Sequence, residues 1–206
     1  MSPTRMHVVS SARRGSSHAG AKAILRAVGC ATAELAQEYT YDELDRRLVA
    51  DRAGLTYLEV CAHFESIEAL IARTCLDRLE QSPMVVEFDH SPRERLVAQF
   101  HQIIMLLACQ PRYGTACVRA LMSNVESVRP VKADIDAEVR RHVSAALGFG
   151  AWPELVSILQ MALLGAVVQA ATNTATLPVL SRRLGDLVEM LLPGGECHLD
   201  PRGPLA

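Results

Sequence analysis

Apolar residues recur at the spacing of an α-helix along most of this chain. Ile24, Leu25, Val28 and Leu35 share one helical face, and the same spacing returns from Leu96 onward. A β-strand would instead alternate its apolar residues with a period of two. Alanine and leucine dominate the apolar residues, and aromatic residues make up only 4% of the chain, so intrinsic propensity also favours helix over strand. The sequence predicts an all-α fold.

Proline, glycine and cap residues divide this pattern into separate helices. In the N-terminal part we expect helices over about residues 21–38, 41–52, 57–63 and 68–79. After Ser82-Pro83 we expect further helices over about residues 92–110, 115–125, 130–147, 153–172 and 178–192.

A short turn joins the second and third expected helices. Thr40 and Glu43 have the form of a capping box, in which a hydroxyl and a carboxylate satisfy free backbone donors at a helix start. Gly54 accepts the left-handed conformation that ends a helix, and Thr56 can cap the next helix. The sequence therefore predicts a helix, a tight turn and a second helix over about residues 41–63.

Composition shifts divide the chain into four parts. Residues 1–20 carry Arg5, Arg13 and Arg14 without apolar periodicity, so we expect a flexible basic arm. We expect one domain over residues 21–82, which contains the helix-turn-helix and a linking helix, and a larger helical domain over residues 83–192. Residues 193–206 are rich in proline and glycine, and we expect a disordered tail there.

Several classes of protein and site are disfavoured. The six cysteines fall at no C-x-x-C spacing, which argues against zinc and disulfide frameworks and for reduced thiols in a cytoplasmic protein; they are Cys30, Cys61, Cys75, Cys109, Cys117 and Cys197. The longest apolar stretch is interrupted by Gln160 and Gln169, so we expect neither export nor membrane insertion. No nucleophile–base pair or phosphate-binding glycine loop is evident, so we expect no enzyme, no metal and no cofactor.

One segment carries a resemblance to a known family. The run Val49-Ala50-Asp51-Arg52-Ala53-Gly54-Leu55-Thr56, then Val60, then His63-Phe64-Glu65-Ser66-Ile67-Glu68-Ala69-Leu70, resembles the family signature I-A-x-x-A-G-V-S-x-G-T-L-Y-x-H-F-x-S-K-E-x-L of the tetracycline-repressor (TetR) family. The register runs without a gap. The resemblance implies an N-terminal helix-turn-helix three-helix domain that binds DNA and a C-terminal helical domain for ligand binding and dimerisation. It also implies a ligand-responsive regulator, usually a repressor, that acts as a homodimer on a near-palindromic operator in double-stranded DNA.

Four departures from the signature fall on positions that touch DNA in that family. Leu58 stands in place of a glycine, Glu59 in place of a threonine, Cys61 in place of a phosphate-binding tyrosine and Ile67 in place of a phosphate-binding lysine. They support an alternative function, in which a TetR-type fold with weakened or lost DNA binding serves as a small-molecule or partner-binding protein.

The charge distribution bears on the same question. Residues 31–70 contain three basic and nine acidic side chains, a net charge of −6, whereas residues 1–30 carry +5. Because a phosphate backbone repels the first segment, we expect any DNA binding to depend on the basic arm in a groove.

The resemblance places the candidate DNA-binding residues on the second and third helices. They are Arg46, Arg47, Thr56, Tyr57, Glu59, Cys61 and His63. Five of them also have a structural interpretation: Thr56 as a helix cap, Tyr57 as a surface aromatic, His63 as a packing or capping residue, and the two arginines as a solvated face.

The candidate ligand-binding residues lie in the larger domain. They are His101, Met105, Cys109, Met122, Gln160, Leu164 and Gln169. Core packing is the stronger interpretation of each, since stripes at helical spacing are usually core, and His101 is the residue of greatest interest. A thiol sensor at Cys109 and Cys117 is disfavoured, because no basic cluster flanks them.

Small and apolar residues at positions 161–168 suit close packing of long helices across a two-fold axis. The last helix adds an apolar stripe that includes Leu180, Leu184 and Val188. We therefore expect a homodimer formed through the last two long helices, with burial inside one subunit as the alternative.

Overall fold

The computed structural model describes residues 9–85, 89–148 and 151–192, and every regular element among them is a helix. The α-helices are α1 (Val9–Glu38), α2 (Arg46–Ala53), α3 (Tyr57–His63), α4 (Ile67–Gln81), α5 (Pro92–Ala108), α6 (Pro111–Met122), α7 (Arg129–Leu147), α8 (Pro153–Ala171) and α9 (Leu177–Leu191), with 3-10 turns η1 (Tyr41–Glu43) and η2 (Glu126–Val128). The predicted all-α fold is confirmed.

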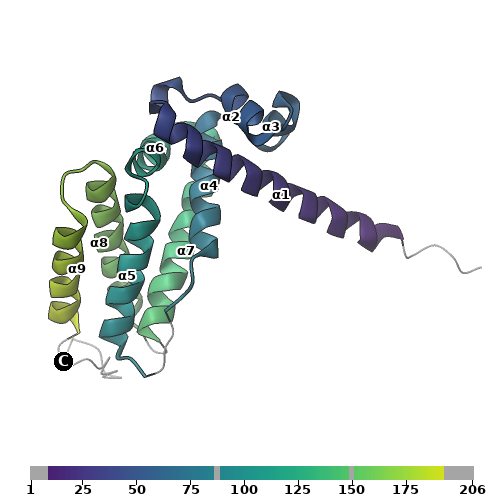
Figure 1. The fold of residues 1–206 in the computed structure, drawn as a ribbon. Coiled ribbons are helices and arrows are strands. Elements are labelled where there is room, and N and C mark those ends of the chain that lie inside the picture. Colours follow the sequence, from purple (N-terminus) through teal and green to yellow (C-terminus); the bar gives the residue numbers. More distant parts are fainter. Residues whose placement is uncertain (1–8, 86–88, 149–150, 193–206) are drawn as a thin grey trace, which may run out of the picture.

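The helices form two groups (Figure 1). At one end α2 and α3 pack beside the long α1, while α5, α7, α8 and α9 run side by side as a bundle. α4 leads from the first group to the second and packs on α1, α6 and α7. The expected tail, residues 193–206, lies outside the described residues.

Two apolar cores hold these groups. The core of the bundle contains Leu96, Phe100, Leu159 and Leu163, all almost fully buried. The other core joins the N-terminal helices to α6 through large side chains, and its members include Val28, Leu35, Val49, Val60, Leu70, Leu107 and Tyr113. Because α6 contributes to this second core, the N-terminal group does not close its core alone.

The first helix starts earlier than the sequence indicated. We expected it to begin at Ala21, whereas α1 begins at Val9. No proline interrupts residues 9–20. The helix that packs from residue 21 onward therefore extends toward the N-terminus, because adding a residue to an existing helix costs less free energy than nucleating a new one. The boundary of the expected arm is corrected accordingly, and residues 1–8 lie outside the described residues.

Two other helix starts also differ. We expected the second helix to begin after Thr40. The Glu43 carboxylate does accept a hydrogen bond from the Thr40 backbone N–H at 2.8 Å, but this contact stabilises only the short turn η1. Asp45 is the true cap of α2. We expected the sixth helix to begin at Thr115, but it begins at Pro111, whose fixed φ suits the first helical position.

Candidate nucleic-acid interface

One helix cap and one glycine fix where α2 begins and where it ends before α3. The Asp45 carboxylate accepts hydrogen bonds from the backbone N–H of Arg47 at 2.8 Å and of Leu48 at 2.7 Å. At the other end of α2, Gly54 has φ +67°, a conformation that other residues adopt only with strain. The predicted helix, tight turn and helix are present, with α3 following at once.

Two buried side chains attach α3 to the domain. Val60 is fully buried and Phe64 nearly so, and both belong to the core shared with α1, α4 and α6. The opposite face of α3 is exposed: Leu58 has 79% of its surface accessible, and Tyr57, Glu59 and His63 are also exposed. α3 therefore presents one face to solvent, as a helix that enters a groove must.

The start of α3 carries a complete capping box. The Thr56 hydroxyl accepts from the Glu59 backbone N–H at 3.2 Å. One Glu59 carboxylate oxygen accepts from both the backbone N–H and the hydroxyl of Thr56, each at 2.7 Å. These hydrogen bonds hold the pKa of Glu59 below its usual value. Glu59 therefore keeps its negative charge on the exposed face, and Thr56 fills the cap role given above as its structural interpretation.

Tyr57 lies beside the two arginines of α2. The guanidinium carbon of Arg47 lies 5.3 Å from the ring centroid, and that of Arg46 lies 5.8 Å from it. Arg46 also donates from Nη1 to the carbonyl oxygen of Phe64 at 2.8 Å, so this side chain ties α2 to the end of α3. Interaction with the Cys61 side chain, one turn further along α3, raises the pKa of the Tyr57 phenol.

A hollow of about 410 Å³ opens between these elements and the start of α4; it is lined by Asp45, Arg46, Arg47, Tyr57, Glu65, Ser66 and Ile67. Arg46, Arg47 and Tyr57 are thus brought together on one surface, while Thr56, at the start of α3, and Cys61, on the next turn of α3, do not line this hollow. His63, at the far end of α3, lines a different hollow between α1 and α4.

Other charges of this region are paired within the chain. Arg52 donates to the Glu38 carboxylate at 2.7 Å and lies 3.6 Å from Glu34. Arg119 of α6 binds Asp42. Arg52 is already counted in the net charge of −6, so only Arg119, a residue of the larger domain, offsets part of that acidic excess from outside the segment.

The structure brings three of the candidate ligand-binding residues together. His101, Met105 and Cys109 follow one another along α5 and line a surface groove of about 580 Å³ with Arg78 and Gln110. His101 also lines a groove of about 720 Å³ between α5 and α9.

The other four candidates lie elsewhere. Met122 is exposed at the end of α6, and Leu164 is partly exposed on α8. Gln160 is buried and donates from Nε2 to the carbonyl oxygen of Asp136 at 3.0 Å, with a second hydrogen bond to the Asp136 carboxylate. Gln169 accepts from Arg183 at 3.5 Å. These seven residues therefore do not form one pocket in this state of the molecule.

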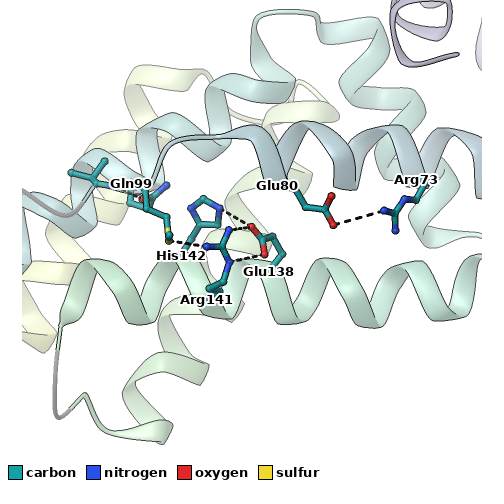
Figure 2. A network of polar contacts seen from close by, with 8 residues as sticks. Arg73, Glu80, Gln99, Glu138, Arg141 and His142 are labelled. Carbon is teal, nitrogen blue, oxygen red and sulfur yellow. Dashed lines mark hydrogen bonds and ion pairs between the residues drawn. The ribbon is translucent and has the colours of Figure 1, made fainter. Parts of the chain in front are cut away.

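A buried polar cluster in the larger domain was missed (Figure 2). His142 of α7 is fully buried, and its Nε2 lies 3.2 Å from a Glu138 carboxylate oxygen. Glu138 also accepts from Arg141, at 2.8 Å from Nε. Gln99 of α5 is fully buried and accepts from the backbone N–H of Val85 at 2.8 Å. Burial lowers the pKa of His142. The only sequence signal was a histidine at a core position of an otherwise amphipathic helix.

α8 carries an apolar stripe that the other helices of the chain do not cover. Ile158, Met161, Leu164 and Val168 recur at helical spacing and are all substantially exposed, Met161 by 65%. By length and composition α8 is also the one described helix apolar enough to cross a membrane. Its opposite face, with Leu159 and Leu163, is buried in the bundle core, which is the pattern of a core helix.

No cluster of histidine, cysteine or acidic side chains suited to a metal ion occurs among the described residues.

Comparison with models of known protein families gives no match. An uncharacterized HTH-type transcriptional regulator of Mycobacterium tuberculosis (strain ATCC 25618 / H37Rv) is 34% identical over 175 residues, which cover 84% of this chain and 82% of that protein. A protein of the same description from Mycobacterium bovis matches equally well, at 34% over 175 residues.

Two solved structures share the fold. A TetR transcriptional regulator from Rhodococcus sp. RHA1 superposes with a TM-score of 0.71 at 21% identity, over 83% of this chain and 95% of that one. The transcriptional regulator FadR from Bacillus subtilis, in complex with stearoyl-CoA, superposes with a TM-score of 0.51 at 14% identity, over 81% of this chain and 96% of that one. The sequence relatives show that the chain belongs to the helix-turn-helix (HTH-type) transcriptional regulators, and its fold is that of a TetR transcriptional regulator.

Proposed function

We propose that this protein is a cytoplasmic, ligand-responsive repressor that binds a near-palindromic operator as a homodimer. The observation that carries the proposal is the exposed face of α3 beside Arg46, Arg47 and Tyr57. An exposed helix enters the major groove, while guanidinium groups at its side bind the phosphates and fix its register. Arg47, which is exposed, serves as the main phosphate contact, and Arg46 mainly orients Tyr57 and α3.

The exposed stripe of α8 supports the homodimer. Ile158, Met161, Leu164 and Val168 would be covered if two copies packed α8 and α9 against each other about a two-fold axis. Gly165 lies within this stripe, with no atom within 4 Å of an added Cβ, so two helix backbones can approach closely there. The dimer then presents two copies of α3 to successive major grooves, about 34 Å apart.

A small-molecule effector would act through the larger domain. The groove along α5 offers His101, Met105 and Cys109 as its lining. Binding there would shift the population between two arrangements of α4, which follows α3 after a short link. The second arrangement would change the spacing of the two recognition helices and release the operator.

A second candidate function follows from the charge of Glu59. This carboxylate is fixed by Thr56 on the exposed face of α3, and it repels phosphate. Leu58 and Ile67 add no compensating cation. In this alternative the chain keeps the fold, binds DNA weakly or not at all, and acts as a small-molecule or partner-binding protein.

Fluorescence anisotropy distinguishes the two functions. The full chain is titrated onto a labelled duplex from the region upstream of its own gene, across a salt series. For the repressor we expect salt-sensitive binding, and Arg47→Ala should weaken it while lowering the salt slope by about one unit. Arg140→Ala, an exposed arginine of α7, is the matched control and should change neither quantity.

Absence of binding at low salt would favour the alternative. In that case the double variant Cys61→Tyr, Ile67→Lys, which restores the two phosphate-binding side chains of the signature, should gain general DNA affinity. A variant that folds but gains none would show that lost contacts alone do not explain the missing activity.

A further inference from the structure

The α5 groove, the hollow of about 580 Å³ along α5 and the end of α4, contains a single permanently charged side chain. That side chain is Arg78, from the last turn of α4. Pro83, Met105 and Leu106 supply apolar surface, and among the described residues no acidic side chain lines the groove. The groove therefore combines apolar surface with one positive charge, which is the chemistry that recognises a small organic anion.

The other charged residues near Arg78 on α4 face a different part of the molecule. Asp77 and Glu80 line the separate hollow between α1 and α4. Arg73 lies 3.9 Å from Glu80 and 3.9 Å from Asp134, so carboxylates compensate its charge. In the part of the chain that the structure describes, no carboxylate forms an ion pair with Arg78. The arginine of α4 that lacks a compensating carboxylate is thus the one that lines the α5 groove.

Uncharged groups hold the Arg78 side chain in place. Its guanidinium carbon lies 4.2 Å from the ring centroid of Tyr113, and its Nη1 donates to the Gln110 side-chain oxygen at 2.9 Å. This hydrogen bond uses one of the guanidinium N–H donors. A carboxylate can accept from two of the others in the paired geometry that arginine favours. Because the side chain is oriented before a ligand arrives, less ordering free energy is lost on binding.

We propose that the α5 groove binds a monocarboxylate with an apolar body, whose carboxylate pairs with Arg78 and whose body lies along Met105 and Leu106. One cation matches one negative charge, so a monoanion suits this groove better than a phosphate dianion. The effect of this ligand on DNA affinity rests on the proposed function, whereas the binding of the carboxylate does not.

Tyr113 connects the α5 groove to the recognition helix. This side chain is fully buried, and its hydroxyl lies 3.1 Å from the hydroxyl of Thr74 on α4. It belongs to the same apolar core as Val60 of α3. A carboxylate that draws the Arg78 guanidinium away from the Tyr113 ring changes the packing of α4 on α6, and this core transmits the change to α3.

The first test measures binding without DNA. Isothermal titration calorimetry of the full chain with octanoate, octan-1-ol and octylamine compares three head groups on the same apolar chain. We expect octanoate to bind to a single site about tenfold more tightly than octan-1-ol, because its head group forms charge-assisted hydrogen bonds, and octylamine to bind more weakly than either. Octanoate that binds no more tightly than octan-1-ol would overturn the proposal.

Variants of the lining locate the site. Arg78→Gln should lower octanoate affinity about tenfold and leave octan-1-ol affinity unchanged. Arg73→Gln, which removes a paired arginine of the same helix outside the α5 groove, is the matched control and should change neither affinity. Octanoate affinity that is the same in Arg78→Gln as in the wild type would place the carboxylate elsewhere and overturn the proposal.

A second variant keeps the packing of Arg78 intact. Cys109 is exposed in the α5 groove, so Cys109→Asp adds a negative charge there without disturbing the core. We expect this variant to bind octanoate several-fold more weakly and octylamine several-fold more tightly than the wild type. Unchanged preference between the two ligands would contradict an electrostatic role for this groove.

The last test measures DNA affinity on the same proteins. We expect saturating octanoate to weaken anisotropy-detected binding to the upstream duplex in the wild type and in Arg73→Gln, and to have no effect in Arg78→Gln. Unchanged DNA affinity with octanoate demonstrably bound would overturn the regulatory part. If the ligand-free chain binds no DNA, the proposed function fails, while calorimetry still decides whether the groove binds a carboxylate.

Discussion

Arg119 of α6 binds Asp42 of η1 through both guanidinium nitrogens, with Nη2–Oδ1 at 2.7 Å and Nη1–Oδ2 at 3.0 Å. The same guanidinium lies 4.2 Å from the ring centroid of Tyr41. This arginine therefore connects the larger domain to the turn that precedes α2. It holds the pKa of Asp42 below its usual value through the paired hydrogen bonds.

We expect Arg119→Ala to weaken DNA binding with little effect on thermal stability. The pair is exposed, and exposed ion pairs contribute little to folding, but its loss frees η1 and α2 to move relative to α6. Arg129→Ala removes another exposed pair, with Glu126 at 3.6 Å, and is the control. Melting curves and anisotropy together test this. Equal DNA affinity for the wild type and Arg119→Ala would show that the pair does not position the helix-turn-helix.

Glu59→Gln should strengthen DNA binding several-fold at low salt. The amide oxygen keeps the hydrogen bonds from Thr56, while the negative charge on the exposed face of α3 disappears. Glu80→Gln on α4 changes the same charge at an exposed site outside α3 and is the control. Anisotropy at two salt concentrations measures the effect. A gain that is the same at high salt would contradict its electrostatic origin.

Met161→Glu should convert the proposed dimer into a monomer. A carboxylate at this site would have to be buried without a partner in the interface of two α8 helices, and that cost exceeds what such an interface tolerates. Ala133→Glu, at an exposed position of α7, is the matched control. Sedimentation velocity at micromolar concentration measures the assembly. A dimer that survives Met161→Glu would place the interface elsewhere.

His142 should make folding stability depend on pH near neutrality. Burial lowers its pKa in the folded state below the ordinary value of 6.5, so the unfolded chain binds the proton more readily. This stability is complete above about pH 6.5 and falls as pH drops from there toward the folded pKa. The Glu138 carboxylate, 3.2 Å away, opposes the shift without reversing it.

Urea unfolding at a series of pH values, with wild type and His142→Gln, isolates this contribution. As the pH falls below about 6.5, we expect the wild type to lose stability more steeply than His142→Gln. Parallel pH profiles would mean that His142 does not titrate differently in the two states.

Local patterns were sufficient for much of the fold. The apolar spacing identified the helices, Gly54 located the tight turn, and Thr56 was identified correctly as a helix cap. These features depend on a few adjacent residues, because cap hydrogen bonds and the left-handed turn conformation involve residues within one helical turn. The start of α2 was misplaced because the Thr40 capping box stabilises only η1, whereas Asp45 caps α2.

The sequence alone determined the helical class, the helix-turn-helix and the departures at Glu59 and Ile67, because these follow from residue types and short spacings. Only the tertiary structure decided which distant side chains meet. Arg119 reaches Asp42 and His142 is buried beside Glu138, while four of the candidate ligand residues lie apart from the other three. Such meetings depend on the angles at which helices cross, which are set by packing across the whole core rather than by any local run of residues.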